Sequence, residues 1–217
     1  MGPLPPFLKA QVGQPDTFQH ERLLHAQGYA RVAGTDEAGR GPLAGPVVAA
    51  CVVLPRDCNT AIFRDSKTLT HLRRTALCRE LRAIGAEVGV GIVSARTIDR
   101  INILQSSLLA MKLALEDLGR HHPLPDFVLV DGKFTIPHAI AQEALIKGEV
   151  KSASIAAASI VAKVQRDALM DGLHQTFPHY NFSRNKGYPT EAHRSAIARY
   201  GPCPQHRRTF RGVREFV

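Results

Sequence analysis

The sequence of 217 residues has few cysteines, and their spacing excludes two kinds of structural site. The four thiols are Cys51, Cys58, Cys78 and Cys203. They form no C-x-x-C pair, and no histidine lies at the spacing that would complete a zinc site with them. We therefore expect neither a zinc-stabilised nor a disulfide-linked fold, and the chain fits a reducing compartment.

Long hydrophobic runs are also missing. No apolar stretch approaches the roughly 18 residues that a membrane-spanning helix needs. Residues 1–11 lack the apolar centre of a signal peptide. These absences predict a cytoplasmic protein that does not associate with membranes.

A third absence concerns the glycine-rich stretch GRGPLAG at residues 39–45. Nucleotide-binding loops present free backbone N–H groups at the start of a helix. Here Pro42 and Pro46 remove two such donors, no Gly-Lys-Ser/Thr triplet is present, and residues 47–54 are typical of a strand. The pattern therefore argues against a nucleotide-binding loop.

What the chain has in excess is positive charge. Its 28 Lys and Arg residues exceed its 19 Asp and Glu residues, which gives a net charge of +9 and a pI near 9.8. An excess of this size favours a polyanionic partner, most often nucleic acid, over a merely basic soluble surface. The hydrophobic fraction of 44% is enough for one core of good size.

Hydrophobic periodicity predicts strands that alternate with helices. Strands are expected at 29–38, 46–54, 86–95, 126–133 and 143–149. Helices are expected from a cap at Thr68 or Thr70 to Ile84, at 94–119 as one or two helices, from a cap at Ser152 or Ser154 to Thr176, and at 190–201. This order predicts an α/β fold, with a mixed five-stranded sheet flanked by helices and a C-terminal helical portion.

The domain organisation follows from the same pattern. We assign residues 1–28 to an N-terminal extension, helical around 18–27 and otherwise loosely ordered. Residues 29–217 form one domain that includes the C-terminal helical region.

Acidic side chains follow the ends of the predicted strands. Asp36 and Glu37 end the first strand, Asp131 follows the buried run FVLV, and Glu149 ends the next short apolar stretch. Each acid taken alone is more simply a solvated residue at the end of a strand or in a turn. If the strands that carry Asp36 and Asp131 are neighbours, however, the four carboxylates can converge at the rim of the sheet.

Converging carboxylates suit hard divalent cations such as Mg²⁺. Two such ions roughly 3.5–4 Å apart can activate water and stabilise the leaving oxygen during phosphodiester cleavage. A carboxylate cluster in a basic chain therefore fits an enzyme that holds a polyanion and reaches it through metal.

Six motifs, in order along the chain, resemble the bacterial ribonuclease HII family. They are DEAGRGPLAGPV (36–47), DSKTLT (65–70), VDGK (130–133), SIAAASIVAKVQRD (154–167), KGYPTEAH (186–193) and HRRTF (206–210). The resemblance covers roughly residues 30–211 and implies the ribonuclease H fold. It also implies cleavage of RNA in RNA–DNA duplexes, especially 5′ of a single ribonucleotide embedded in DNA. The cut leaves a 3′-hydroxyl and a 5′-phosphate and initiates ribonucleotide excision repair.

The resemblance places the metal-binding, catalytic carboxylates at Asp36, Glu37 and Asp131, with Mg²⁺ or Mn²⁺ as the cofactor and two ions during catalysis. The family's fourth carboxylate is an Asp after Gly, where this chain has Glu149. Asp167 is the alternative, although its i−4 neighbour Lys163 predicts an ordinary ion pair. We favour Glu149.

Substrate recognition is implied for two segments. Gly39, Arg40 and Gly41 resemble the segment whose backbone approaches the ribose 2′-OH, and glycines allow such a close approach. Tyr188 matches the tyrosine that packs on the sugar beyond the ribonucleotide. Basic side chains expected to contact phosphate are Lys67, Lys163 and Lys186, together with Arg166 and Arg184. Less specific assignments are backbone contacts by Ser66 and Thr190, and His193 either beside the metals or in a structural role.

The expected partners are RNA–DNA hybrids and DNA that contains ribonucleotides, and the chain is expected to be a monomer. Three alternatives remain at this point. The first is a ribonuclease HIII-like enzyme, which would carry a longer N-terminal domain and a different glycine turn. The second is a DNA-cutting relative of the same fold. The third is a non-catalytic nucleic-acid-binding protein, if Glu149 prevents metal binding.

Overall fold

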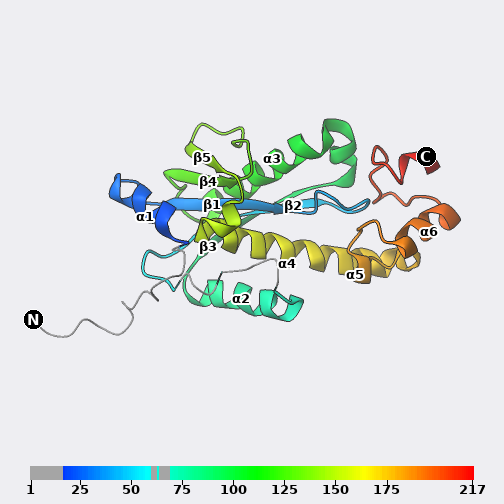
Figure 1. Ribbon diagram of the computed structural model, residues 1–217, viewed down its shortest axis with the longest axis horizontal. Helices are drawn as coiled ribbons and strands as arrows, with labels where there is room; N and C mark the ends of the chain where they lie inside the picture. Colours follow the sequence, from blue (N-terminus) through cyan, green and yellow to red (C-terminus); the bar gives the residue numbers. More distant parts are fainter. Residues whose placement is uncertain (1–16, 60–62, 64–68) are drawn as a thin grey trace, which may run out of the picture.

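The computed structural model describes residues 17–59, 63 and 69–217, and a single five-stranded sheet lies at its centre (Figure 1). The strands are β1 (Val32–Ala38), β2 (Val47–Val53), β3 (Glu87–Val93), β4 (Phe127–Asp131) and β5 (Ala141–Leu145). Their order across the sheet is β3-β2-β1-β4-β5. Strands β1, β2 and β3 pair antiparallel, whereas β4 and β5 run parallel to β1. The predicted mixed sheet is confirmed.

Helices cover both faces of this sheet. The α-helices are α1 (Gln19–Ala26), α2 (His71–Ala83), α3 (Ala95–His121), α4 (Ala153–Thr176), α5 (Phe182–Asn185) and α6 (Glu191–Tyr200), and the 3₁₀ helices are η3 (Gly148–Val150), η4 (Pro178–Tyr180) and η5 (Arg214–Phe216). Helix α3 lies on one face, and α2 and α4 lie on the other (Figure 1). Within the described residues, no helix is both long and apolar enough to cross a membrane.

Strand β2 explains why the sequence has an unbroken apolar run after the glycine turn. All seven of its residues are buried. Successive side chains of a strand point to opposite faces. Accordingly, Ala49 and Cys51 pack in the cluster with α3, while Ala50 and Val52 pack in the cluster with α2 and α4. A strand covered on both faces has no polar side, so its sequence does not alternate.

Side-chain caps define where the long helices begin. The Thr70 hydroxyl accepts a hydrogen bond from the Arg73 N–H at 3.3 Å and starts α2. The Ser152 hydroxyl accepts from the Ile155 N–H at 3.2 Å and starts α4. Such caps satisfy backbone donors that have no partner inside the helix.

Helix α3 differs in two ways from its simplest sequence-based description. It consists of two helices joined at Asn102, whose φ of 66° is not helical. The predicted end at Gly119 is wrong, because the helix continues to His121. Gly119 instead makes room for a neighbour, since a Cβ there would lie 2.6 Å from Leu124 Cδ2. Pro123 soon follows and cannot continue a helix.

The helix expected around residues 18–27 is present as α1, and it packs on the rest of the chain. Phe18 and Leu24 are buried in core clusters. Glu21 is only 1% exposed, and its Oε1 accepts hydrogen bonds from the hydroxyls of Ser152 and Ser154, each at 2.6 Å. Part of the segment 1–28 therefore holds the amino end of α4 in place.

Candidate active site

The two central strands bring the acidic residues of distant segments together. Strands β1 and β4 are parallel neighbours with Thr35 opposite Val130, so Asp36 and Asp131 follow at the same end. Asp36 is 6% exposed and accepts the Glu37 N–H at 2.7 Å. The Ser159 hydroxyl of α4 also donates to it. The condition for convergence, that these two strands are adjacent, is therefore met.

Electrostatic repulsion marks this group of carboxylates. Burial, and then the charges of Glu37 and Asp131, raise the pKa of Asp36 well above its usual range. Burial and the Asp131 charge also raise the pKa of Glu37, although Arg40 opposes the shift. The Arg40 guanidinium lies 3.2 Å from Glu37 Oε1. Two buried acids whose pKa values are raised by burial and by neighbouring carboxylates form a site that a cation would stabilise.

The donor chemistry at this site fits a hard divalent metal, because every acidic ligand offers oxygen. Among the residues that the structure describes, no three His, Cys, Asp or Glu side chains stand in positions that would hold a metal ion as they are. Mg²⁺ usually binds through one or two carboxylates together with several waters and substrate phosphate. Asp36, Glu37 and Asp131 are the side chains that would hold it.

The two candidates for a fourth carboxylate occupy different surroundings. Glu149 is half-buried in η3, directly after Gly148, whose N–H donates to Asp131 Oδ1 at 2.6 Å. Asp167 lies on α4 and accepts from the Lys163 ammonium at 2.7 Å, the pairing that its helical spacing predicts. Glu149 therefore directly follows a residue that is hydrogen-bonded to Asp131, and Asp167 forms an ion pair with Lys163.

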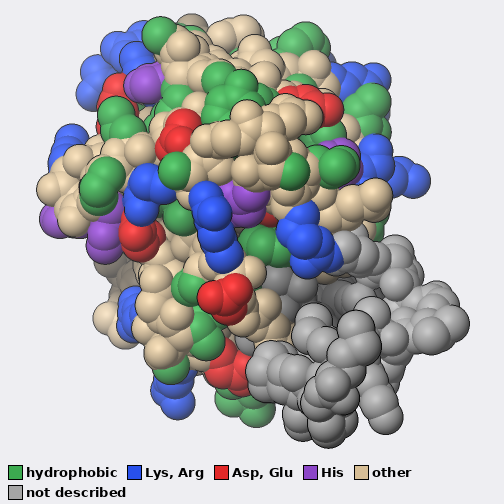
Figure 2. Space-filling model, turned by 90° about the vertical axis from the view of Figure 1, so that its left-hand side faces the viewer, with side chains coloured by type: hydrophobic (Ala, Val, Ile, Leu, Met, Phe, Trp, Pro, Cys, Tyr) green, Lys and Arg blue, Asp and Glu red, His purple; other side chains and the backbone are tan. Residues whose placement is uncertain are grey.

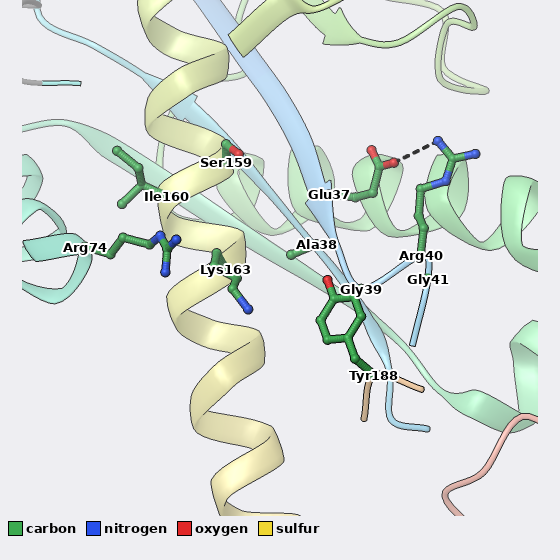
Figure 3. Close-up of a pocket in the computed structure, with 10 residues that line it drawn as sticks. All are labelled: Glu37, Ala38, Gly39, Arg40, Gly41, Arg74, Ser159, Ile160, Lys163 and Tyr188. Atoms are coloured by element: carbon green, nitrogen blue, oxygen red, sulfur yellow. Dashed lines mark hydrogen bonds and ion pairs between the residues drawn. The ribbon is translucent and has the colours of Figure 1, made fainter. Parts of the chain in front are cut away.

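A pocket of about 350 Å³ opens beside the acids (Figure 3). It is lined by Glu37, Ala38, Gly39, Arg40, Gly41, Arg74, Ser159, Ile160, Lys163 and Tyr188. The sequence indicates six of these residues, namely Glu37, Gly39, Arg40, Gly41, Lys163 and Tyr188. It missed Ser159, although the spacing of seven from Ser152 places both on one helical face. Arg74 and Ile160 carry no local signal that separates them from other helix residues.

The glycine turn and Tyr188 lie side by side in the lining of this pocket (Figure 3). A Cβ added to Gly41 would lie 3.7 Å from Tyr188 Cε1. The Tyr188 ring is 42% exposed, and the Lys163 ammonium lies 5.9 Å from its centre. The two segments that the sequence links to substrate recognition therefore form one surface next to the carboxylates.

Arg166 does not contact phosphate, and that prediction is wrong. The side chain is fully buried under the glycine turn and donates to the carbonyls of Ala44, Pro46 and Lys186 at 2.9–3.1 Å. A Cβ on Gly39, whose φ is +101°, would lie 2.1 Å from Arg166 Nε. Only glycine therefore allows the turn to lie so close to this guanidinium.

Arg207 supports the same turn from the C-terminal segment. Its buried guanidinium donates to the carbonyls of Gly39, Arg40 and Gly45. Burial, and then the charge of Arg166, lower the pKa of Arg207 to about 9. Nothing in the local sequence distinguishes this arginine from its exposed neighbour Arg208.

The other residues predicted to contact the substrate differ in their exposure and in their partners within the protein. Arg184 is exposed. Lys186 is mostly buried, forming an ion pair with Asp171 and donating to the Asp167 carbonyl at 3.4 Å. Thr190 caps α6 by accepting the His193 N–H at 3.2 Å. Lys67 and Ser66 lie outside the described residues.

His193 belongs to a buried histidine pair. Its Nε2 lies 3.0 Å from Nε2 of His206, and its Nδ1 lies 2.9 Å from the Tyr188 carbonyl. His206 Nδ1 in turn accepts the Cys203 N–H at 3.0 Å. Burial, and then the neighbouring His193, lower the pKa of His206 to about 4. His193 therefore has the structural role that was one of its two expected roles.

This low pKa predicts a pH-dependent stability. In the unfolded chain His206 gains a proton below about pH 6.5, while in the folded chain it stays neutral to about pH 4. The free energy of unfolding therefore decreases as the pH falls through that window. Between pH 7 and pH 4.5 the loss from His206 amounts to about 2 kcal/mol.

Urea unfolding of the wild-type chain and of His206→Gln at both pH values measures this loss. Taking the difference between the two proteins removes the opposite effect of Asp36 and Glu37, whose pKa values are raised. We expect the variant to lose about 2 kcal/mol less than wild type over this range. Parallel pH profiles would contradict a neutral, buried His206.

The sheet order and the acids at the ends of its two central strands define a protein of the ribonuclease H-like fold. The family model described as "Ribonuclease HII" matches residues 33–213. The chain belongs to the ribonuclease HII family, and it is accordingly an endoribonuclease, a phosphodiester hydrolase.

Individual relatives agree with this assignment. Ribonuclease HII of Desulfotalea psychrophila is 59% identical over 202 residues, which are 93% of this chain and 90% of the relative. Ribonuclease HII of Geotalea daltonii is 52% identical over 204 residues, 94% of this chain and 93% of the relative. Among solved structures, ribonuclease H2 of Pyrococcus horikoshii superposes with a TM-score of 0.70 at 28% identity, covering 86% of this chain and 96% of that one.

Proposed function

We propose that this endoribonuclease cuts RNA in RNA–DNA duplexes with the help of divalent metal, and acts above all 5′ of a single ribonucleotide embedded in DNA. One observation carries the proposal: the glycine turn and Tyr188 form a single pocket directly beside the buried carboxylates. Ribose recognition and phosphodiester cleavage then fall on adjacent groups of one substrate.

The carboxylates have the catalytic role in this proposal. Asp36, Glu37, Asp131 and Glu149 hold Mg²⁺ or Mn²⁺, which supplies activation of water and stabilisation of the leaving oxygen. The solved structure of a ribonuclease HIII in complex with Mn²⁺, which shares the fold at 19% identity, shows that relative binding this ion. The hydrolysis leaves a 3′-hydroxyl and a 5′-phosphate.

In this proposal, the glycine turn and Tyr188 distinguish ribose from deoxyribose. The 2′-OH distinguishes RNA from DNA, and the backbone of Gly39–Gly41 can approach it because Gly41 carries no side chain toward the pocket. The exposed ring of Tyr188 packs on the following deoxyribose. Lys163, which lines the pocket, provides positive charge for a phosphate. Lys186 and Lys67 remain further proposed phosphate contacts.

The charge distribution supports a polyanion on the C-terminal side. Residues 184–217 contain eight Lys or Arg and two acids. Their net charge of +6 is two thirds of the net charge of +9 of the whole sequence. A second pocket of about 450 Å³ lies in this region, lined by Arg194, Arg211, Gly212 and Glu215. On the opposite end, which carries α1, the visible charges of both signs are interspersed (Figure 2). A duplex would therefore extend from the acids toward the C-terminal helices.

The test compares three duplexes of the same sequence: DNA with one ribonucleotide, all-DNA, and a continuous RNA–DNA hybrid. Each is incubated with Mg²⁺, with Mn²⁺ and with EDTA, and the products are sized on a denaturing gel. We expect metal-dependent cutting 5′ of the single ribonucleotide and none of all-DNA. The absence of cutting with either metal would reject the proposed function.

The fourth carboxylate is tested separately. Glu149→Ala is expected to reduce cutting by about 100-fold or more, because a metal ligand next to Asp131 is lost. Glu149→Asp should retain activity, and Asp167→Asn should change the rate by only a few fold, since Asp167 pairs with Lys163. If Asp167→Asn alone abolishes cutting, Glu149 is not the fourth ligand.

A further inference from the structure

The C-terminal segment connects both recognition elements of the pocket. We propose that His206 and Arg207 are positioning residues that fix the glycine turn and Tyr188 relative to each other and thereby set the preference for an RNA–DNA junction. This inference rests on the proposed function. Neither side chain lines the pocket, so both act through other residues.

Arg207 determines the orientation of the glycine turn. Its guanidinium donates to the carbonyls of Gly39 and Arg40, the latter at 2.9 Å, and to that of Gly45 at 3.0–3.1 Å. The backbone N–H of Arg207 donates to the Leu43 carbonyl at 2.8 Å. In a trans peptide the N–H points opposite to the C=O. With the carbonyls of Gly39 and Arg40 held toward Arg207, the next two N–H groups point away from it.

The histidine pair holds the backbone of Tyr188 in one arrangement. A carbonyl can only accept, so His193 Nδ1 carries the proton that the Tyr188 carbonyl receives. Neutral His193 then accepts at Nε2, and His206 must donate from its own Nε2. His206 is left to accept the Cys203 N–H at Nδ1. Every ring nitrogen of the two histidines is hydrogen-bonded, and the donors and acceptors of these hydrogen bonds can be assigned in only one way.

Both supports come from consecutive residues of one short segment. A displacement of His206 is carried through His193 to the Tyr188 carbonyl, and the same displacement moves Arg207 and the turn. The spacing between the group that reads the ribose and the ring that packs on the next sugar is therefore set from outside the pocket. A junction needs both at once, whereas a continuous hybrid offers a ribose at every position.

The experiment measures kcat/KM for the duplex with one ribonucleotide and for the continuous RNA–DNA hybrid, and takes their ratio. Arg207→Lys removes the planar fork but keeps the charge. Arg208→Lys makes the same change at the exposed neighbouring residue. We expect the ratio to fall about tenfold in Arg207→Lys, as displaced binding groups do, and to stay unchanged in Arg208→Lys. A purely structural defect lowers both rates by the same factor, and an unchanged ratio would overturn the proposal.

Two His206 variants keep the test decisive if Arg207→Lys folds poorly. Gln can reach His193 with an N–H donor, while the shorter Asn reaches only the position of Nδ1. The ratio of the two kcat/KM values should be about tenfold lower in His206→Asn than in wild type. In His206→Gln it should stay within about twofold of wild type. Equal ratios in the two variants would contradict positioning through His193.

Failure of this inference is separable from failure of the proposed function. A wild-type enzyme with no preference for the single ribonucleotide rejects the proposed function itself. A wild-type enzyme that has the preference, with variants that keep it, rejects only the positioning role of His206 and Arg207.

Discussion

Asp36→Asn is expected to reduce cleavage of a ribonucleotide-containing duplex by about 1,000-fold while making the metal-free protein more stable. The loss follows from removing a proposed metal ligand, and about 4 kcal/mol of transition-state stabilisation corresponds to this factor. The gain follows from the buried charge, which Glu37 and Asp131 repel. Asparagine can still accept the Glu37 N–H. Relief of that repulsion should stabilise the fold by about 1 kcal/mol.

The measurement pairs a cleavage assay with urea unfolding in EDTA and in Mg²⁺. Adding Mg²⁺ should stabilise the wild-type protein more than the variant, because a ligand that binds only the folded state raises its stability. Asp57→Asn is the matched control, since it removes an exposed acid in the loop after β2. A variant that retains activity, or one that is destabilised in EDTA, would contradict the role given to Asp36.

Gly34→Ala is expected to destabilise the fold by about 3–4 kcal/mol, an effect of overpacking. A Cβ on Gly34 would lie 2.2 Å from the Ile155 nitrogen and 2.3 Å from the Ser154 carbonyl carbon. Both are backbone atoms at the amino end of α4, so they cannot move aside as a flexible side chain would. Strand β1 and α4 would have to separate, and they carry Asp36 and Ser159.

The matched control is Gly172→Ala, which lies inside α4 with nothing within 4 Å of the added Cβ. There alanine should stabilise by about 0.5–1 kcal/mol, because glycine is a poor helix residue. Urea midpoints of the two variants should therefore shift in opposite directions. A Gly34→Ala variant within about 0.5 kcal/mol of wild type would mean that α4 packs less tightly on β1 than described.

Local sequence patterns predicted what depends on neighbours in the chain. Periodicity gave the sheet and most helices, and the i−4 spacing of Lys163 and Asp167 gave their ion pair. Asp36 and Asp131 could be linked because each follows a buried strand, and only the adjacency of those strands had to be assumed. Gly119 misled the assignment of a helix end because its partner, Leu124, lies beyond that end.

Long-range contacts account for what the sequence could not give. Arg166 and Arg207 look like any surface arginine, yet most of their acceptors are carbonyls of the glycine turn, more than 100 residues away. Glu21 looks like a solvated acid, and its partner Ser152 lies 131 residues further along the chain. Buried polar side chains with distant backbone partners leave no periodic pattern, so tertiary structure alone reveals them.

The contact between Glu21 and the start of α4 has an electrostatic consequence for substrate binding. A helix of 24 residues has a partial positive charge at its amino end, a common place for a phosphate to bind. Here the Glu21 carboxylate already takes that place, accepting the Ser154 N–H at 3.0 Å. The helix dipole is thus neutralised within the protein. In the proposed function, the amino end of α4 therefore adds little to the attraction of a nucleic-acid backbone, and the contribution of side-chain cations to it weakens as salt is added.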